Sequence, residues 1–168
     1  SPNRFRGIRH NITHNPDPTW DNRETGAGVV TSAKFIEGAK VLSQKGLRLD
    51  IMQSFPQLPE IAEFAKAVPD LPIIVNHVGG VSRVGIYAGK DDEIIPVWKE
   101  GISAVAACPN VTMKLGGLGM PRFGFGWHAR EKPIGSEELA ESMTPWMRHC
   151  IEQFGPDRCM FESNFPPD

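Results

Sequence analysis

The sequence predicts an α/β protein built on a parallel sheet. Segments typical of β-strands alternate with segments typical of helices along the 168 residues, and no two strand segments are joined directly as a hairpin. Residues 71–75 are almost continuously aliphatic, which is typical of a strand covered by helices on both faces. Because parallel strands need long connections, this order favours parallel strands with right-handed helical crossovers.

The chain opens on a predicted strand at residues 5–11, followed by a polar stretch at 11–28 that has no apolar period. Loops of that length inside a compact domain are usually functional or mobile. Residues 31–45 carry apolar side chains at helical spacing, and Gly46 follows as a natural stop. The beginning of the chain therefore predicts one strand, one long loop and one helix.

The middle of the chain repeats this order. Residues 47–53 alternate between apolar and polar side chains as a strand does, and an amphipathic helix begins near Pro59. The central strand follows within residues 71–80, and His77 stands at its carboxyl end, before a glycine pair. The loop at 81–92 is rich in glycine, and a helix is expected from about residue 93 to residue 107.

The last part of the chain contains two more strands. Residues 111–115 form the fourth predicted strand, and a long glycine-rich connection leads to Ser136, which is expected to cap a helix. Pro145 is expected to kink or divide this helix, and residues 158–164 form the fifth strand. Long loops follow the strands whereas the links from helix to strand are short, which favours part of a (β/α)8 TIM barrel. The alternative, an open doubly wound sheet, lacks a glycine-rich nucleotide motif after any strand.

Composition excludes several classes of function. The formal net charge is −2, which gives no electrostatic basis for binding nucleic acid or an anionic membrane. The apolar runs are far shorter than the roughly 20 residues of a membrane span. The three cysteines are widely spaced and odd in number, so we interpret them as reduced residues of a cytoplasmic protein.

Candidate site residues lie at the ends of predicted strands, where ligands bind in parallel α/β folds. His77 is the first candidate for catalysis, although a hydrogen-bonded structural histidine explains its position as well. Lys114 suits a substrate carboxylate or a developing oxyanion, or is a lysine whose ammonium simply reaches water. The remaining candidates for substrate binding are Arg9, His10, Asp50, Gln53 and Trp127, with an ion pair across the barrel as the alternative for the charged ones.

A series of short motifs extends through nearly the whole chain. They are Gly7-Ile8-Arg9-His10, Leu49-Asp50, Pro56-Gln57-Leu58, Asn76-His77-Val78-Gly79-Gly80, Tyr87-Ala88-Gly89, Cys108-Pro109-Asn110-Val111, Lys114-Leu115-Gly116-Gly117-Leu118-Gly119-Met120 and Phe161-Glu162-Ser163-Asn164-Phe165-Pro166. In this order the sequence resembles the amidohydrolase-2 family. More narrowly, it resembles the TIM-barrel hydrolases related to 2-pyrone-4,6-dicarboxylate lactonase and L-fuconolactonase.

The resemblance implies an eight-stranded barrel with a His-x-His pair on strand 1, a histidine on a middle strand and an aspartate at the end of strand 8. Residues 1–168 would then be the C-terminal portion of the barrel, roughly strands 4 to 8, without its first strands. His77 would be the middle-strand histidine, a catalytic residue and a metal ligand. Asn164 stands where the family has its aspartate, with Glu162 and Asp168 as the nearest carboxylates.

The resemblance also implies the chemistry. We expect hydrolysis of a lactone or a related cyclic ester or amide, by attack of water at the carbonyl of a small, carboxylate-bearing substrate. After His77, the expected catalytic residue is Asn164 or Asp168, at the end of the last strand. Asn164 cannot act as a base at neutral pH, so either Asp168 or Glu162 would take that part, or this branch of the family works differently. A divalent metal, zinc or manganese, and a metal-free route both stay open, because a catalytic metal needs about three protein ligands. The alternatives are a non-oxidative decarboxylase and a non-catalytic barrel-derived binding protein. Open sheet edges would favour homo-oligomers.

Overall fold

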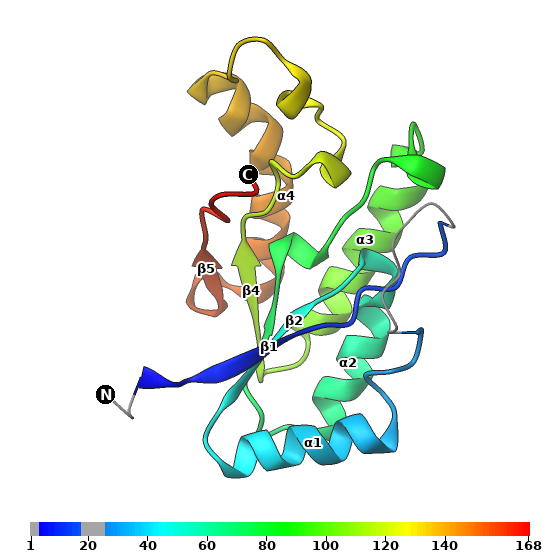
Figure 1. Ribbon diagram of the computed structural model, residues 1–168, viewed down its shortest axis with the longest axis vertical. Coiled ribbons are helices and arrows are strands. Elements are labelled where there is room, and N and C mark those ends of the chain that lie inside the picture. Colours follow the sequence, from blue (N-terminus) through cyan, green and yellow to red (C-terminus); the bar gives the residue numbers. More distant parts are fainter. Residues whose placement is uncertain (1–3, 18–25) are drawn as a thin grey trace.

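The computed structural model describes residues 4–17 and 26–168 of the chain. Within these residues the chain forms a parallel sheet of five strands, and four helices of ten or more residues follow the first four strands (Figure 1). The strands are β1 (Gly7–Asn11), β2 (Arg48–Met52), β3 (Ile73–Val75), β4 (Val111–Leu115) and β5 (Cys159–Phe161). The helices are α1 (Ala33–Gln44), α2 (Leu58–Ala67), α3 (Asp91–Ala106) and α4 (Ser136–Phe154).

The strand order in space is the same as the order in the chain. With right-handed crossovers, this order places every helix on the same face of the sheet, which is the arrangement in a barrel wall. A doubly wound sheet would instead reverse its strand order and place helices on both faces. The prediction of an α/β fold with part of a (β/α)8 barrel is confirmed, and the doubly wound alternative is not.

Side chains alternate between the two faces of the sheet. Leu49 and Ile51 on β2 are buried, as are Val111 and Met113 on β4, so this set faces the helix layer. The side chains between them keep partial exposure on the face without helices. The apolar core therefore lies between sheet and helices, and the open face is free to carry polar groups. The largest fully buried side chains include Trp98, Phe64, Phe123, Ile51, Leu58 and Met113.

The structure corrects several predicted boundaries. The central strand ends at Val75, earlier than predicted, and a short 3-10 helix covers residues His77–Gly79. Ser136 is the first residue of α4 and not its cap, a position that Gly135 takes. Pro145 lies inside α4 without dividing it. Part of the predicted loop at 11–28 lies outside the described residues.

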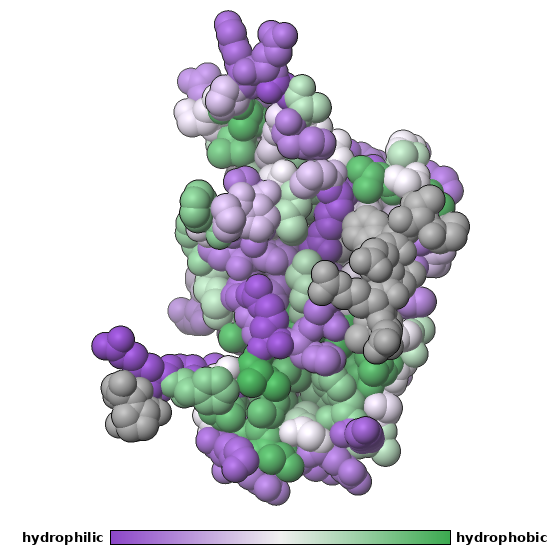
Figure 2. All heavy atoms as spheres, in the orientation of Figure 1, coloured by the Kyte–Doolittle hydropathy of each residue, from purple (hydrophilic) through white to green (hydrophobic). Residues whose placement is uncertain are grey.

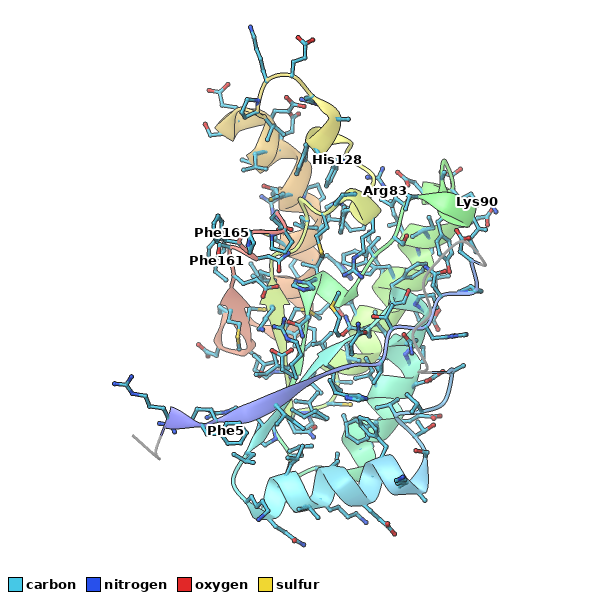
Figure 3. The ribbon with its side chains drawn as sticks, in the orientation of Figure 1. Phe5, Arg83, Lys90, His128, Phe161 and Phe165 are labelled. Atoms are coloured by element: carbon cyan, nitrogen blue, oxygen red, sulfur yellow. The ribbon has the colours of Figure 1, made fainter. Side chains whose placement is uncertain are left out.

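Both edges of the sheet carry exposed aromatic side chains. Phe5 beside β1 is 61% exposed, whereas Phe161 on β5 and Phe165 after it are 79% and 85% exposed and project together (Figure 3). Between β1 and α1 there is an apolar cavity of about 370 Å³, and hydrophobic residues gather over this part of the surface (Figure 2). No helix in the described ranges is both long enough and apolar enough to span a bilayer.

Candidate active site

Five polar residues and His77 meet at the carboxyl ends of the strands, where the sheet has no helix cover. The strand register explains why they meet. Arg9 and Asp50 are directly paired across β1 and β2. Residues two positions apart along a strand face the same side. Asn76, Lys114 and Glu162 come two residues after Ile74, Thr112 and Met160, so all three lie on the open face. The set is Arg9, Asp50, Asn76, His77, Lys114 and Glu162.

Asp50 is the centre of a charged cluster. Its carboxylate accepts hydrogen bonds from Arg9 at 2.8 and 3.2 Å and from Lys114 at 2.6 Å, and it also accepts one from the Asn76 amide. Burial opposes the charged form, but the bonds from Arg9, Lys114 and Asn76 outweigh it and lower the pKa of Asp50. Asp50 therefore stays anionic and holds two cations in place.

His77 forms the second part of the site. Its Nδ1 lies 2.6 Å from Oε1 of Glu162, although the two residues are 85 positions apart in the chain. Burial raises the pKa of Glu162, but the bond from His77 and the charges of His77, Lys114 and Arg9 outweigh it, so the pKa is lowered. The Lys114 ammonium is 3.7 Å from the other oxygen of Glu162. Nε2 of His77 has no hydrogen-bond partner in the described part of the chain.

The backbone around His77 is strained. His77 and Val78 have φ angles of 54° and 45°, and a branched residue such as valine rarely adopts this region. Hydrogen bonds hold this strained conformation in place. On one side, Nε1 of Trp98 on α3 donates to the Val78 carbonyl at 2.8 Å. Gln53 donates to the Asn76 carbonyl at 2.9 Å on the other side. This arrangement fixes the imidazole at the end of β3.

A glycine-rich loop leaves β4 and passes over these side chains. A Cβ at Gly117 would lie 2.5 Å from the His77 ring, and one at Gly116 would lie 2.4 Å from Cγ of Glu162. Gly117 also has a φ of 73°, which only glycine adopts without cost. The two glycines therefore allow the loop to approach the histidine and the glutamate closely.

The structure places the other predicted residues around this centre. Asn164 donates to Asp168 at 2.8 Å, and this pair is exposed. Trp127 stacks on Phe125 at 4.3 Å and lines a cavity of about 560 Å³ together with Glu162 and Asp168.

His10 points to the opposite face of the sheet, where its ring is 5.6 Å from that of Phe35 on α1. Its distance from the cluster follows from the alternation of β1, since Arg9 occupies the open face.

Comparison with known proteins gives the family. The family model described as amidohydrolase matches residues 3–168. The chain belongs to the amidohydrolase family. A Sinorhizobium fredii protein described as the uncharacterized protein y4mH is 32% identical over 98% of the chain, and an L-fucono-1,5-lactonase of Burkholderia multivorans is 23% identical over 97%. The chain spans about half the length of these relatives, 48% and 49% respectively.

Solved amidohydrolase structures share the fold. A Burkholderia multivorans amidohydrolase with bound zinc has a TM-score of 0.73 at 24% identity, covering 96% of this chain and 50% of that one. A Pseudomonas putida protein described as a 2-pyrone-4,6-dicarboxylic acid hydrolase has a TM-score of 0.60 at 18% identity, over 96% of this chain and 48% of that one. Both matches confirm that the sheet is about half of an amidohydrolase barrel.

The described residues of this amidohydrolase do not by themselves fit a metal ion. No group of three or more histidine, cysteine, aspartate or glutamate side chains with suitable geometry occurs among them. Asp50 is already paired with Arg9 and Lys114. The Lys114 ammonium also lies 3.7 Å from Oε2 of Glu162. His77 is thus at most one ligand of a site that other residues would complete.

Sequence reasoning did not assign a role to Asn76, and it named Glu162 only as an alternative to Asp168 for the base, with no partner. Asn76 accepts from Arg9 at 3.1 Å and from Lys114 at 3.0 Å, so it joins the two cations. The signal for Glu162 was present in the alternation of its strand, since it lies two residues after Met160 on the open face. The contact with His77 depends on the curvature of the sheet, which one sequence does not give.

Proposed function

We propose that this chain provides part of the active site of a hydrolase that opens a lactone or a related cyclic ester or amide. The observation that carries the proposal is the 2.6 Å contact between Nδ1 of His77 and Oε1 of Glu162, at the carboxyl ends of the strands. A histidine oriented by a carboxylate, with its second nitrogen unpaired, is an arrangement suited to general base catalysis. The lactonases among the relatives support the substrate class.

In the proposed mechanism, Nδ1–H of His77 donates a hydrogen bond to the Glu162 carboxylate and keeps its proton, so the lone pair of the neutral imidazole is on Nε2. Nε2 takes a proton from water as the water oxygen attacks the lactone carbonyl, and a tetrahedral oxyanion forms. The bond between the carbonyl carbon and the ring oxygen then breaks, and Nε2 returns the proton to the leaving alkoxide. The products are a hydroxyl group and a carboxylic acid.

Glu162 and Lys114 are positioning residues in this mechanism. Glu162 fixes the tautomer of His77 and stabilises the imidazolium that forms, as carboxylates do for catalytic histidines elsewhere. Lys114 helps to keep Glu162 charged, since its ammonium contributes to the lowered pKa of that carboxyl. We propose that Glu162, and not Asp168, takes the part of the carboxylate at the end of the last strand. A metal-assisted route would instead use Nε2 of His77 as a ligand.

The test is lactone hydrolysis by the protein expressed with all the sequence its gene encodes, measured on a panel of five- and six-membered lactones. Loss of a general base typically costs roughly a hundred-fold or more in kcat, so H77A should be nearly inactive. E162Q should lose less and should show a shifted pH profile. E138Q is the matched control, since Glu138 is exposed and pairs with Arg130 on the surface. Full activity in H77A would refute the proposal. A chelator that abolishes activity would favour the metal-assisted route.

A further inference from the structure

A cavity of about 560 Å³ lies beside the proposed catalytic pair and plays no part in the proposed mechanism. Glu162 belongs to both, because it lines the cavity and its Oε1 lies 2.6 Å from Nδ1 of His77. The volume falls within the range of roughly 300–1,000 Å³ that is typical of small-molecule sites. A group bound in this cavity therefore lies next to the reacting part of a substrate held at His77.

One wall of the cavity is a stripe of apolar side chains on α4. Leu139, Met143 and Met147 follow one another at intervals of four residues, so they lie along one face of the helix. All three are only half-buried, as is Ile134, which precedes the helix and lines the same cavity. The described residues therefore leave part of this apolar surface unpacked, and an apolar ligand would gain free energy by covering it.

Trp127 supplies an aromatic surface to the cavity, and stacked rings hold it in place. Its ring lies 4.3 Å from that of Phe125 with 6° between the planes, and Phe125 stacks in turn on Phe123 at 5.2 Å. Phe123 is buried and makes an edge contact with Trp146 on α4 at 5.0 Å. Phe125 does not line the cavity, so the cavity meets the part of Trp127 that this stack leaves uncovered. The indole is therefore a preorganised surface for a further ring.

The charged groups around the cavity favour a neutral ligand. No lysine or arginine is among the described residues that line it, and its titratable side chains are Glu162, Asp168 and the exposed His128. A carboxylate buried there would have no lysine or arginine partner and would lie near two acidic side chains, which is costly. The substrate carboxylate expected from the sequence therefore has no place in this cavity.

We propose that this cavity binds an uncharged aromatic group of the substrate, and that Trp127 determines this specificity. As a statement about the substrate this rests on the proposed hydrolase function, whereas binding of the aromatic group can be measured without turnover. The substrate class is then a lactone, or a related cyclic ester or amide, that carries an aryl substituent. The aryl ring stacks on Trp127 and contacts Met143 and Met147, whose thioether groups pack favourably against aromatic rings.

Binding is tested with 2-phenyltetrahydrofuran, a ring ether that resembles a phenyl-bearing lactone but has no carbonyl to hydrolyse, and with tetrahydrofuran-2-carboxylate. Titration calorimetry on the protein with all its encoded sequence should show at least roughly ten-fold tighter binding of the phenyl compound, as expected from burial of one aromatic ring. W127A should lose roughly ten-fold in affinity for it, and W127F, which keeps a ring, should lose much less. I8A is the control, because Ile8 lines the apolar cavity between β1 and α1.

The hydrolytic arm compares γ-butyrolactone with γ-phenyl-γ-butyrolactone. W127A should lower the ratio of the two kcat/KM values, phenyl-bearing to unsubstituted, by roughly ten-fold. I8A should leave this ratio unchanged.

Four results decide between the alternatives. Equal binding of the phenyl compound and the carboxylate by the wild-type protein would overturn the site even if W127A fails to fold. Loss of binding in I8A but not in W127A would place the ligand beside α1 and would also overturn the site. An unchanged ratio of kcat/KM values in W127A would overturn the role of Trp127 in specificity. If the phenyl compound binds as expected and no lactone is hydrolysed, the site stands and the proposed hydrolase function fails.

Discussion

Replacement of Asp50 by asparagine tests the charged cluster directly. The Asp50 side chain is 17% exposed and that of Lys114 is 14% exposed, so this pair is largely shielded from water. The Arg9 side chain is 51% exposed, so water screens its attraction to Asp50. Removing one partner of a buried pair typically costs about 3–5 kcal/mol, and exposed pairs are worth under about 1 kcal/mol. Because part of both side chains still meets solvent, we expect D50N to lose about 2–3 kcal/mol of unfolding free energy at pH 7.

The pH dependence of this loss has a defined sign. The folded pKa of Asp50 is lowered, so its stabilisation is present above the unfolded pKa of about 3.9 and disappears as the pH falls through the folded value. Urea unfolding of both proteins should therefore show a gap at pH 7 that narrows below about pH 4. D91N is the control, since the Arg83–Asp91 pair is more exposed at 22% and 39%. A gap under about 0.5 kcal/mol at pH 7, or one that is unchanged in acid, would refute a stabilising role for the cluster.

Two further predictions concern the loop and the sheet edges. G117A should lose at least roughly ten-fold in the rate of lactone hydrolysis, because a Cβ there lies 2.5 Å from the His77 ring. G126A is the control, since Gly126 has a similar φ of 71° and open space around it. G126A should keep its rate of hydrolysis and lose only about 1–2 kcal/mol of unfolding free energy, from the left-handed backbone conformation. The 168-residue chain expressed alone should self-associate through its open edges, where Phe5 and Phe161 are 61% and 79% exposed. Sedimentation velocity at several concentrations tests this, and a monodisperse monomer would contradict it.

The fold could be predicted from the sequence because each signal is local. The spacing of apolar residues gives each helix, the alternation of residues 47–53 gives β2, and the predicted strand at 111–115 coincides with β4. The end of β3 was predicted less well. A pattern of side chains does not report that Val78 adopts a φ of 45°, since that conformation depends on Trp98, twenty residues away, binding its carbonyl.

The site could be predicted in its parts but not in its pairing. Strand ends identified Arg9, Asp50, His77 and Lys114, since parallel strands present such residues at one edge. The sequence does not show that Asp50 engages both cations, because the distances depend on how far neighbouring strands are staggered. The substrate-binding role expected for Arg9 and Lys114 has to be set against their pairing with Asp50, which the sequence does not show.

We propose that Glu162 supplies the carboxylate of the last strand, which the family resemblance places at residue 164, where this chain has asparagine. Residues two apart on a strand face the same side and are separated by about 6.6 Å, so a carboxylate at 162 enters the same space as one at 164, one pleat deeper. Asn164 has a φ of 53°, so the chain has left the extended conformation there. The Glu162 side chain, one residue after the end of β5, has its Oε1 2.6 Å from Nδ1 of His77. Under this proposal the carboxylate of the last strand contacts the histidine from residue 162 and not from residue 164.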